Sequence, residues 1–202
     1  MTEILFQGHG SLRVTAPDGT VIYIDPFIGE GYDRPADLIL VTHQHFDHTK
    51  TGKPAKKPGC MIWSNFDFLI DGQYQTKALG AVTVRAVEAY NAKHPKSECV
   101  GYILTIDGKK IYVAGDTSKT EQMASLALEN LDCAFLPIDG KYNMGPEEAS
   151  ECAALIKAKR VVPYHMVPTM PGFAKGFDQK RAEAFKAENR VILPAGETLT
   201  LD

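Results

Sequence analysis

Residues 43–48, HQHFDH, hold three of the six histidines of the chain and one aspartate. Alternate residues of an extended segment face the same side, so His43 and His45 can direct two imidazoles to one point. Where the chain then turns into a helix, Asp47 and His48 can direct an oxygen and a nitrogen to a neighbouring point. Such nitrogen and oxygen donors suit zinc, and manganese and iron also accept them. The segment therefore predicts ligands for two divalent metal ions.

Each candidate ligand follows an apolar segment that reads as a strand. Residues 37–42, DLILVT, predict a strand buried on both faces, so His43 begins the loop at its carboxyl end, where α/β sheets place their ligands. His94, Asp116 and His165 lie just beyond further predicted strands. Because strand ends can gather along one edge of a sandwich, these scattered residues can converge in space. One carboxylate oxygen on each metal would make Asp116 a bridge.

The remaining pattern predicts an α/β sandwich with mixed sheets and covering helices. Short segments rich in β-branched and aromatic residues open the chain, and Asp18-Gly19 and Asp107-Gly108 predict hairpin turns. Strands and helices alternate in the second half. We predict helices over 120–130, 145–159 and 178–189, a final strand over 190–194, and a single domain over 1–202.

Composition narrows the range of partners. The net charge is −3 and the chain has no long basic block, which argues against a nucleic-acid-binding surface. No apolar run reaches the roughly 18 residues of a membrane span. The four cysteines lie far apart without a CxxC pair, which predicts reduced core thiols in a cytoplasmic protein. We expect a small-molecule substrate, no nucleic acid and no membrane, and we leave a homo-oligomer open.

Several motifs together resemble the metallo-β-lactamase-fold metallohydrolases over nearly the whole chain. They are HxHxDH at 43–48, a later histidine, GDT at 115–117 and a final histidine at 165. The segments GHGSLRV, YIDPF, EAYNAKHP, VGYIL and LPIDGKYNMGPEEA look like the branch of ascorbate-6-phosphate lactonase-like and small zinc-dependent hydrolases. The resemblance implies an αββα four-layer sandwich of two mixed β-sheets, with the site at the sheet edge.

The resemblance also implies a full ligand assignment for two divalent ions, zinc in the first place and manganese or iron as alternatives. One ion would be held by His43, His45 and His94. The other would be held by Asp47, His48 and His165, with Asp116 bridging the two.

Two cations about 3.5–4 Å apart can share a water and lower its pKa toward 7, so that a metal-bound hydroxide attacks a phosphodiester, lactone or ester. Asp47 or Asp116 could orient the hydroxide or pass a proton, and both options stay open. Asp25 ends a predicted strand and matches a family motif, so we expect it to hold a ligating histidine in place. His9, between two glycines, either reaches the site or serves a turn.

Other residues are candidates for substrate contact. Tyr142 and Met144 follow a strand and could wall the pocket. Residues 165–177 are rich in glycine and proline and could form a lid. Lys175 and Arg181 could meet an anionic substrate, although a solvated cation is the default for each.

Three other functions compete with a small-molecule hydrolase. A nuclease of the same fold would act on RNA or DNA, against the acidic charge balance. Iron in the same site could support redox chemistry, which would normally need a flavin domain for which the chain has no room. A non-catalytic metal-binding module would not need an open metal position.

Overall fold

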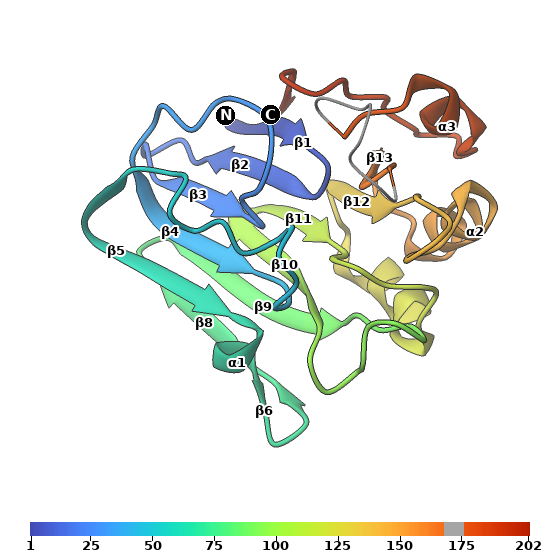
Figure 1. Cartoon of the computed structure of the whole chain (residues 1–202), viewed down its shortest axis with the longest axis horizontal. Coiled ribbons are helices and arrows are strands. Elements are labelled where there is room, and N and C mark those ends of the chain that lie inside the picture. Colours follow the sequence, from blue (N-terminus) through green and yellow to red (C-terminus); the bar gives the residue numbers. More distant parts are fainter. Residues whose placement is uncertain (168–175) are drawn as a thin grey trace.

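The computed structural model describes residues 1–167 and 176–202 and is built mainly from two six-stranded β-sheets packed face to face (Figure 1). The first sheet has the order β14-β1-β2-β3-β4-β5, with strands β1 Thr2–Gly8, β2 Ser11–Thr15, β3 Val21–Ile24, β4 Ala36–Val41, β5 Lys56–Ser64 and β14 Thr198–Leu201. The second has the order β13-β12-β11-β10-β9-β8, with strands β8 Thr76–Leu79, β9 Val82–Glu88, β10 Val100–Ile106, β11 Lys109–Val113, β12 Cys133–Pro137 and β13 Val161–Tyr164. A small hairpin of β6 Leu69–Ile70 and β7 Gln73–Tyr74 stands apart from both sheets.

The two sheets share one pairing pattern. In the first, β14, β1, β2 and β3 pair antiparallel, and β3, β4 and β5 pair parallel. In the second, β8, β9, β10 and β11 pair antiparallel, and β11, β12 and β13 pair parallel. Both sheets are therefore mixed, as predicted. The carboxyl ends of β3, β4, β11 and β12 point to the same side of the molecule (Figure 1), which creates one rim from both sheets.

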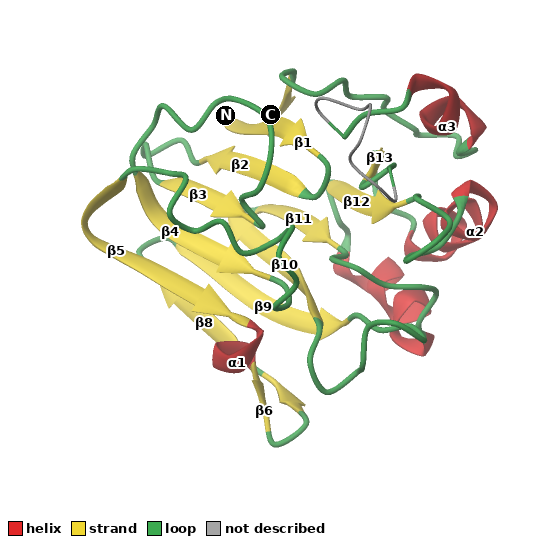
Figure 2. Cartoon of the chain, viewed as in Figure 1, coloured by secondary structure: helices red, strands yellow, loops and turns green. Residues whose placement is uncertain are grey.

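Apolar packing holds the layers together. The largest core cluster joins residues of the first sheet, such as Ile22 and Leu40, to residues of the second, such as Leu104 and Phe135, and therefore lies between the sheets. A second cluster lies between the outer face of the second sheet and the helical segments, which are grouped on that side (Figure 2). These segments are η1 Glu121–Glu129, α2 Pro146–Ile156 and α3 Gln179–Ala184; the short α1 Asn65–Phe68 follows β5.

The outer face of the first sheet is covered differently. A third, smaller cluster includes Tyr23 and Ile39, and Tyr32 from the following loop packs against it. The rings of Tyr23 and Tyr32 stack with centroids 5.4 Å apart. In the described part of the chain, a loop therefore covers this face where the second sheet has helices.

Both predicted hairpin turns are confirmed. Ile106 pairs with Lys109, which leaves Asp107 and Gly108 as a two-residue loop, and both have positive φ (49° and 76°). A two-residue loop with this geometry matches the right-handed twist of the flanking strands. The strand predicted over 37–42 is confirmed as β4, which is fully buried apart from Asp37 because it lies between β3 and β5.

The predicted helices are shorter than expected. The segment 120–130 forms the 3₁₀-helix η1, and 178–189 yields only the six residues of α3, because Phe185 adopts an extended conformation. The helix predicted over 145–159 is α2, with Pro146 in its first turn, and it ends at Ile156 because the next residue, Lys157, has a left-handed φ of 53°.

The prediction of a final strand at 190–194 was wrong. Among the described residues, this segment has one isolated bridge, between Val161 and Arg190, and the last strand is β14, which pairs with β1. Leu193 is buried in the core between the sheets, whereas Ile192 packs against the cluster under the helices. The run of three apolar residues at 191–193 indicated packing against the core correctly but did not indicate a hydrogen-bonded neighbour.

Candidate metal centre

The residues predicted to bind metal come together at the rim formed by both sheets. His43 follows β4, Asp116 follows β11 and His165 follows β13, each within three residues of the strand end. His94 lies in the loop between β9 and β10, and His9 in the turn between β1 and β2. Residues that are far apart in sequence therefore meet because parallel strands of two packed sheets end on the same side.

Three sets of side chains lie close enough to share an ion, with their donor atoms within 4.8 Å of one another. They are His43 with His45 and His94; His43 with His48 and Asp116; and His9 with Asp47, His48 and His165. All seven predicted ligands belong to at least one set. His9, which we expected only as a supporting residue or a turn residue, joins the set that contains His165.

The carboxylate of Asp116 lies between histidines of different sets. Its Oδ1 is 3.5 Å from His48 Nε2 and 3.3 Å from His165 Nε2. Its Oδ2 is 3.3 Å from His94 Nε2. Oδ2 thus faces His94 and Oδ1 faces His48 and His165, which is the arrangement that a bridging carboxylate requires.

Unpaired polar atoms provide a test of whether a cation fits here. The Nε2 atoms of His43, His48 and His165 and the Oδ1 atom of Asp116 are buried, and none has a hydrogen-bond partner among the described residues. Buried polar groups are normally paired, because an unpaired one carries a full desolvation cost. Nitrogen and oxygen donors that converge in this way match the ligand preferences of zinc and related ions. The donor set therefore fits a metal ion.

Electrostatics at the site reflect the crowding of charge. Burial opposes protonation of His48, but the carboxylates of Asp116 and Asp25 raise its pKa to about 10. Burial would likewise raise the pKa of Asp116, yet His165 and His48 hold it well below its ordinary value. Burial and the neighbouring His48 lower the pKa of His43 to about 2. A metal ion bound by these groups would compete with the protons that the carboxylates favour on His48.

Asp25 orients two of the histidines, as expected for one of them. Its Oδ2 accepts a hydrogen bond from His48 Nδ1 at 2.8 Å and one from the Thr42 hydroxyl at 2.6 Å. Because the single hydroxyl proton of Thr42 points to Asp25, its oxygen can accept from His43 Nδ1, 3.0 Å away. Both imidazoles are thereby held with Nδ1 protonated and Nε2 free to bind a metal.

Two further buried histidines, His94 and His165, each have beside Nδ1 a polar side chain that the sequence did not reveal. Asn91 Oδ1 lies 3.0 Å from His94 Nδ1, and Asp139 Oδ2 lies 3.3 Å from His165 Nδ1. Asn91 is only three residues before His94, so a local turn could have suggested it. Asp139 follows β12, one of the parallel strands, and that position is the sequence feature that could have pointed to it.

Backbone strain is concentrated at this rim. His9, Asp25 and His165 have φ values of 54°, 47° and 43°, in a region that non-glycine residues seldom adopt. Gly115, just before Asp116, has a φ of 67°, and a Cβ there would lie 2.8 Å from the Val100 carbonyl oxygen. Only glycine fits at that point, and the fold thereby brings the Asp116 carboxylate close to the histidines.

The residues that we expected to contact the substrate differ in their burial. Met144 is 1% exposed and packs in the cluster under the helices, so its side chain serves the core and not a pocket wall; this prediction was wrong. Tyr142 is exposed, and its role stays a prediction. Most of the proposed lid falls on residues 168–175, including Lys175, which lie outside the described residues.

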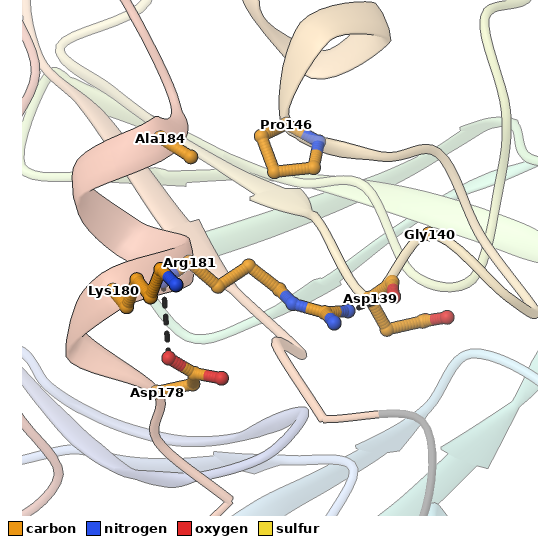
Figure 3. A pocket seen from close by; sticks show the side chains of 7 residues that line it. All are labelled: Asp139, Gly140, Pro146, Asp178, Lys180, Arg181 and Ala184. Carbon is orange, nitrogen blue, oxygen red and sulfur yellow. Dashed lines mark hydrogen bonds between the residues drawn. The ribbon is translucent and has the colours of Figure 1, made fainter.

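Arg181 occupies a separate pocket beside Asp139. It extends from α3 toward Asp139 (Figure 3), and its guanidinium donates a hydrogen bond to the Asp139 backbone carbonyl. Arg181 therefore supports the loop that carries Asp139, and contact with an anionic substrate stays a prediction.

The cysteines are free thiols, as predicted, but they are not equally buried. Cys99, Cys133 and Cys152 are buried, whereas Cys60 on the edge strand β5 is partly exposed. In the described part of the chain, no helix is long and apolar enough to cross a membrane.

A two-sheet sandwich with paired histidine and carboxylate sets at one rim defines the class of metallo-β-lactamase-fold metal-binding proteins, and comparisons with known proteins agree. A model of the beta-lactamase superfamily domain matches residues 3–165. A UPF0173 metal-dependent hydrolase of Myxococcus xanthus is 34% identical over 96% of this chain and 81% of its own length. Another, from Thermococcus onnurineus, is 32% identical over the full length of both chains.

A solved structure shows the same fold. It is a provisionally assigned metal-dependent hydrolase from Parabacteroides distasonis, 28% identical, with a TM-score of 0.74 over 95% of this chain and 91% of that one. The chain therefore belongs to the beta-lactamase superfamily and, within it, to the UPF0173 metal-dependent hydrolases. It is an enzyme, which excludes the non-catalytic alternative, while the names of these relatives specify neither a substrate nor a metal.

Proposed function

We propose that the protein is a dinuclear hydrolase of small-molecule phosphodiesters, lactones or esters, with two divalent ions that are zinc in the first place. The position of the Asp116 carboxylate carries the proposal. Its two oxygens face His94 on one side and His48 and His165 on the other, each at 3.3–3.5 Å. A site for one ion would not need a carboxylate placed between two groups of histidines.

In this assignment His43, His45 and His94 hold one ion, and Asp47, His48 and His165 hold the other. Bound divalent ions would supply Lewis acidity, lowering the pKa of water and polarising an oxygen of the substrate. The protein does not have to supply a nucleophile of its own.

Asp47 is the group best placed to handle a proton. Its Oδ2 lies 3.0 Å from His9 Nε2, and its side chain is 20% exposed, so it is open to both the site and solvent. His9 packs closely against His165, with ring centroids 3.7 Å apart and ring planes tilted by 43°, and this packing fixes its ring. We infer that His9 orients Asp47, and that Asp47 accepts a proton and passes it to the leaving group.

The residues around the site favour a small substrate over a nucleic acid. His45 and Phe46 are exposed at the rim, and Phe46 lies edge-on to Phe27 with centroids 5.8 Å apart. An exposed aromatic edge suits an uncharged group of a small molecule better than a phosphate backbone, which would need cations.

Metal analysis combined with a hydrolysis panel tests the proposal. The purified protein should contain two ions per chain and hydrolyse bis-p-nitrophenyl phosphate, a lactone or a simple ester, with poor turnover of a β-lactam. Chelation should abolish this activity and lower the melting temperature by about 5–10 °C, because ions that bind only the folded state stabilise it. A saturating stoichiometry of one ion per chain, or brisk turnover of the β-lactam alone, would contradict the proposal.

A further inference from the structure

We propose that Asn143 is a positioning residue that helps to orient one histidine ligand of each metal ion, although it contacts neither histidine. It connects Asp139, the partner of His165, to Asn91, the partner of His94. The inference rests on the dinuclear site proposed above and adds to it a residue outside the predicted ligands and their direct partners.

On the His165 side, the network is centred on the carboxylate of Asp139. Its Oδ2 lies 3.3 Å from His165 Nδ1 and accepts a hydrogen bond from Asn143 Nδ2 at 2.7 Å. Its Oδ1 accepts from the backbone N–H groups of Lys141 and Tyr142 at 2.8 and 2.7 Å. Both oxygens are thus held, and the Asp139 side chain is fully buried. Asp139 therefore has little freedom to turn away from His165.

On the His94 side, the amide of Asn91 plays the same part. Its Oδ1 lies 3.0 Å from His94 Nδ1 and also accepts from the backbone N–H groups of Lys93 and His94. Its Nδ2 donates to the Tyr142 carbonyl at 2.9 Å and to Asn143 Oδ1 at 3.4 Å. These contacts fix which end of the amide faces His94, so His94 donates from Nδ1 and its Nε2 is left for a metal.

The side chain of Asn143 is suited to this position because it both donates and accepts. Its Nδ2 serves Asp139 and its Oδ1 serves Asn91, and the residue is 8% exposed. An aspartate could not donate to Asp139, and an aliphatic residue could do neither.

The two ends of this network belong to different metal sets. His94 groups with His43 and His45, whereas His165 groups with His9, Asp47 and His48. Loss of Asn143 is therefore expected to loosen a ligand of both ions. A residue that only stabilised its own loop would lower the melting temperature and leave metal affinity unchanged.

Metal affinity in Asn143→Ala tests the inference. Metal-free wild type and variant are titrated with Zn²⁺ against a chromophoric chelator, and with Co²⁺ while the visible absorption of each site is followed. We expect both ions to bind about 10-fold to 100-fold more weakly in the variant, the range found for groups that orient metal ligands. Lys141→Ala is the matched control, because Lys141 is exposed and meets Asp139 only through its backbone; it should bind both ions as wild type does.

The outcomes separate the two proposals. Failure of wild type to bind two ions would contradict the dinuclear function. Wild type that binds two ions, together with Asn143→Ala that binds both equally well, would overturn the role of Asn143, whatever its melting temperature. Should Asn143→Ala not fold, Asn91→Ala replaces it, since Asn91 is only half-buried. That variant should weaken the His94 ion at least tenfold and the His165 ion less; unchanged affinity at the His94 ion would overturn the inference.

Discussion

The two halves of the metal centre hold their histidines in orientation by different arrangements of side chains. In the N-terminal half, four candidate ligands fall within residues 43–48, and one carboxylate, Asp25, orients His48 directly and His43 through Thr42. In the C-terminal half, His94, Asp116 and His165 come from separate loops, and a chain of three side chains, Asn91, Asn143 and Asp139, connects the two histidines. A compact ligand segment can be held by one hub, whereas dispersed ligands need a network that spans the loops.

This difference contrasts with the equivalence of the two sheets, which share one strand-pairing pattern. Both sheets supply ligands at the same rim. What differs is how the chain leaves the strands. The loop after β4 carries four candidate ligands itself, whereas in the second half the ligands and the groups that face them are spread over the loops after β9, β11, β12 and β13. Orientation in the second half thus depends on contacts between loops.

The largest effect should come from the residue that both halves share. Asp116→Ala removes the carboxylate whose two oxygens face both sets of histidines. We expect hydrolysis to fall by on the order of a thousandfold, because the charge stabilisation supplied by a metal pair is several kcal/mol. Metal content should drop from two ions to one or none per chain, as measured by elemental analysis. Activity within tenfold of wild type would show that the two halves work independently.

The N-terminal hub should be less tolerant than any single member of the C-terminal network. Asp25→Asn places an amide N–H group among three donors, the Thr42 N–H and hydroxyl and His48 Nδ1, in a fully buried position. We expect about a 100-fold loss of metal affinity and a destabilisation of about 2–4 kcal/mol in denaturant unfolding.

Asp37→Asn is its matched control. Asp37 lies at the other end of β4, where it accepts from the Val21 N–H and pairs with Lys57. This variant should keep the metal affinity of wild type. If Asp25→Asn reduced metal affinity less than Asn143→Ala does, the C-terminal half would be the less tolerant of the two, contrary to this prediction.

His9 allows a smaller, more selective test. In His9→Ala, Asp47 loses its 3.0 Å partner, while the other candidate ligands stay. We expect kcat to fall about tenfold, less than the roughly 10²–10⁴-fold contributed by a proton-transfer group itself, because His9 only orients Asp47, and we expect both ions to remain bound. Loss of one ion in this variant would instead make His9 a ligand of the His165 set.

The smallest expected effect concerns the reactivity of the cysteine thiols, which reports how well the outer face of each sheet is covered. Burial raises the pKa of Cys99, Cys133 and Cys152 to about 12, so these thiols stay protonated and unreactive at pH 8. Cys60 lies on the exposed edge strand β5 and should be the one thiol that a thiol reagent modifies in the native protein. Four thiols should react after unfolding, and activity should be unaffected by native labelling. Rapid native modification of Cys152, which packs in the cluster under the helices, would show that the helices do not protect the second sheet.

The sequence by itself determined the candidate ligand residues and the kind of fold. The HxHxDH segment carries its geometry locally, because an extended stretch places alternate side chains on one side. His94, Asp116 and His165 became candidates because each follows an apolar strand, and the resemblance to the metallo-β-lactamase fold, not their spacing, joined them into one ligand set. The buried strand β4 and both hairpin turns were predictable from patterns confined to a few residues.

The tertiary structure alone decided what lies around those ligands. The roles of Asn91, Asp139 and Asn143 depend on contacts between loops that follow different strands, and no local pattern encodes them. Burial of Met144 and the pairing of β14 with β1 likewise depend on how distant segments pack. Spacing along a chain fixes which direction a side chain takes relative to its neighbours, but only the packed sheets fix which distant group it meets.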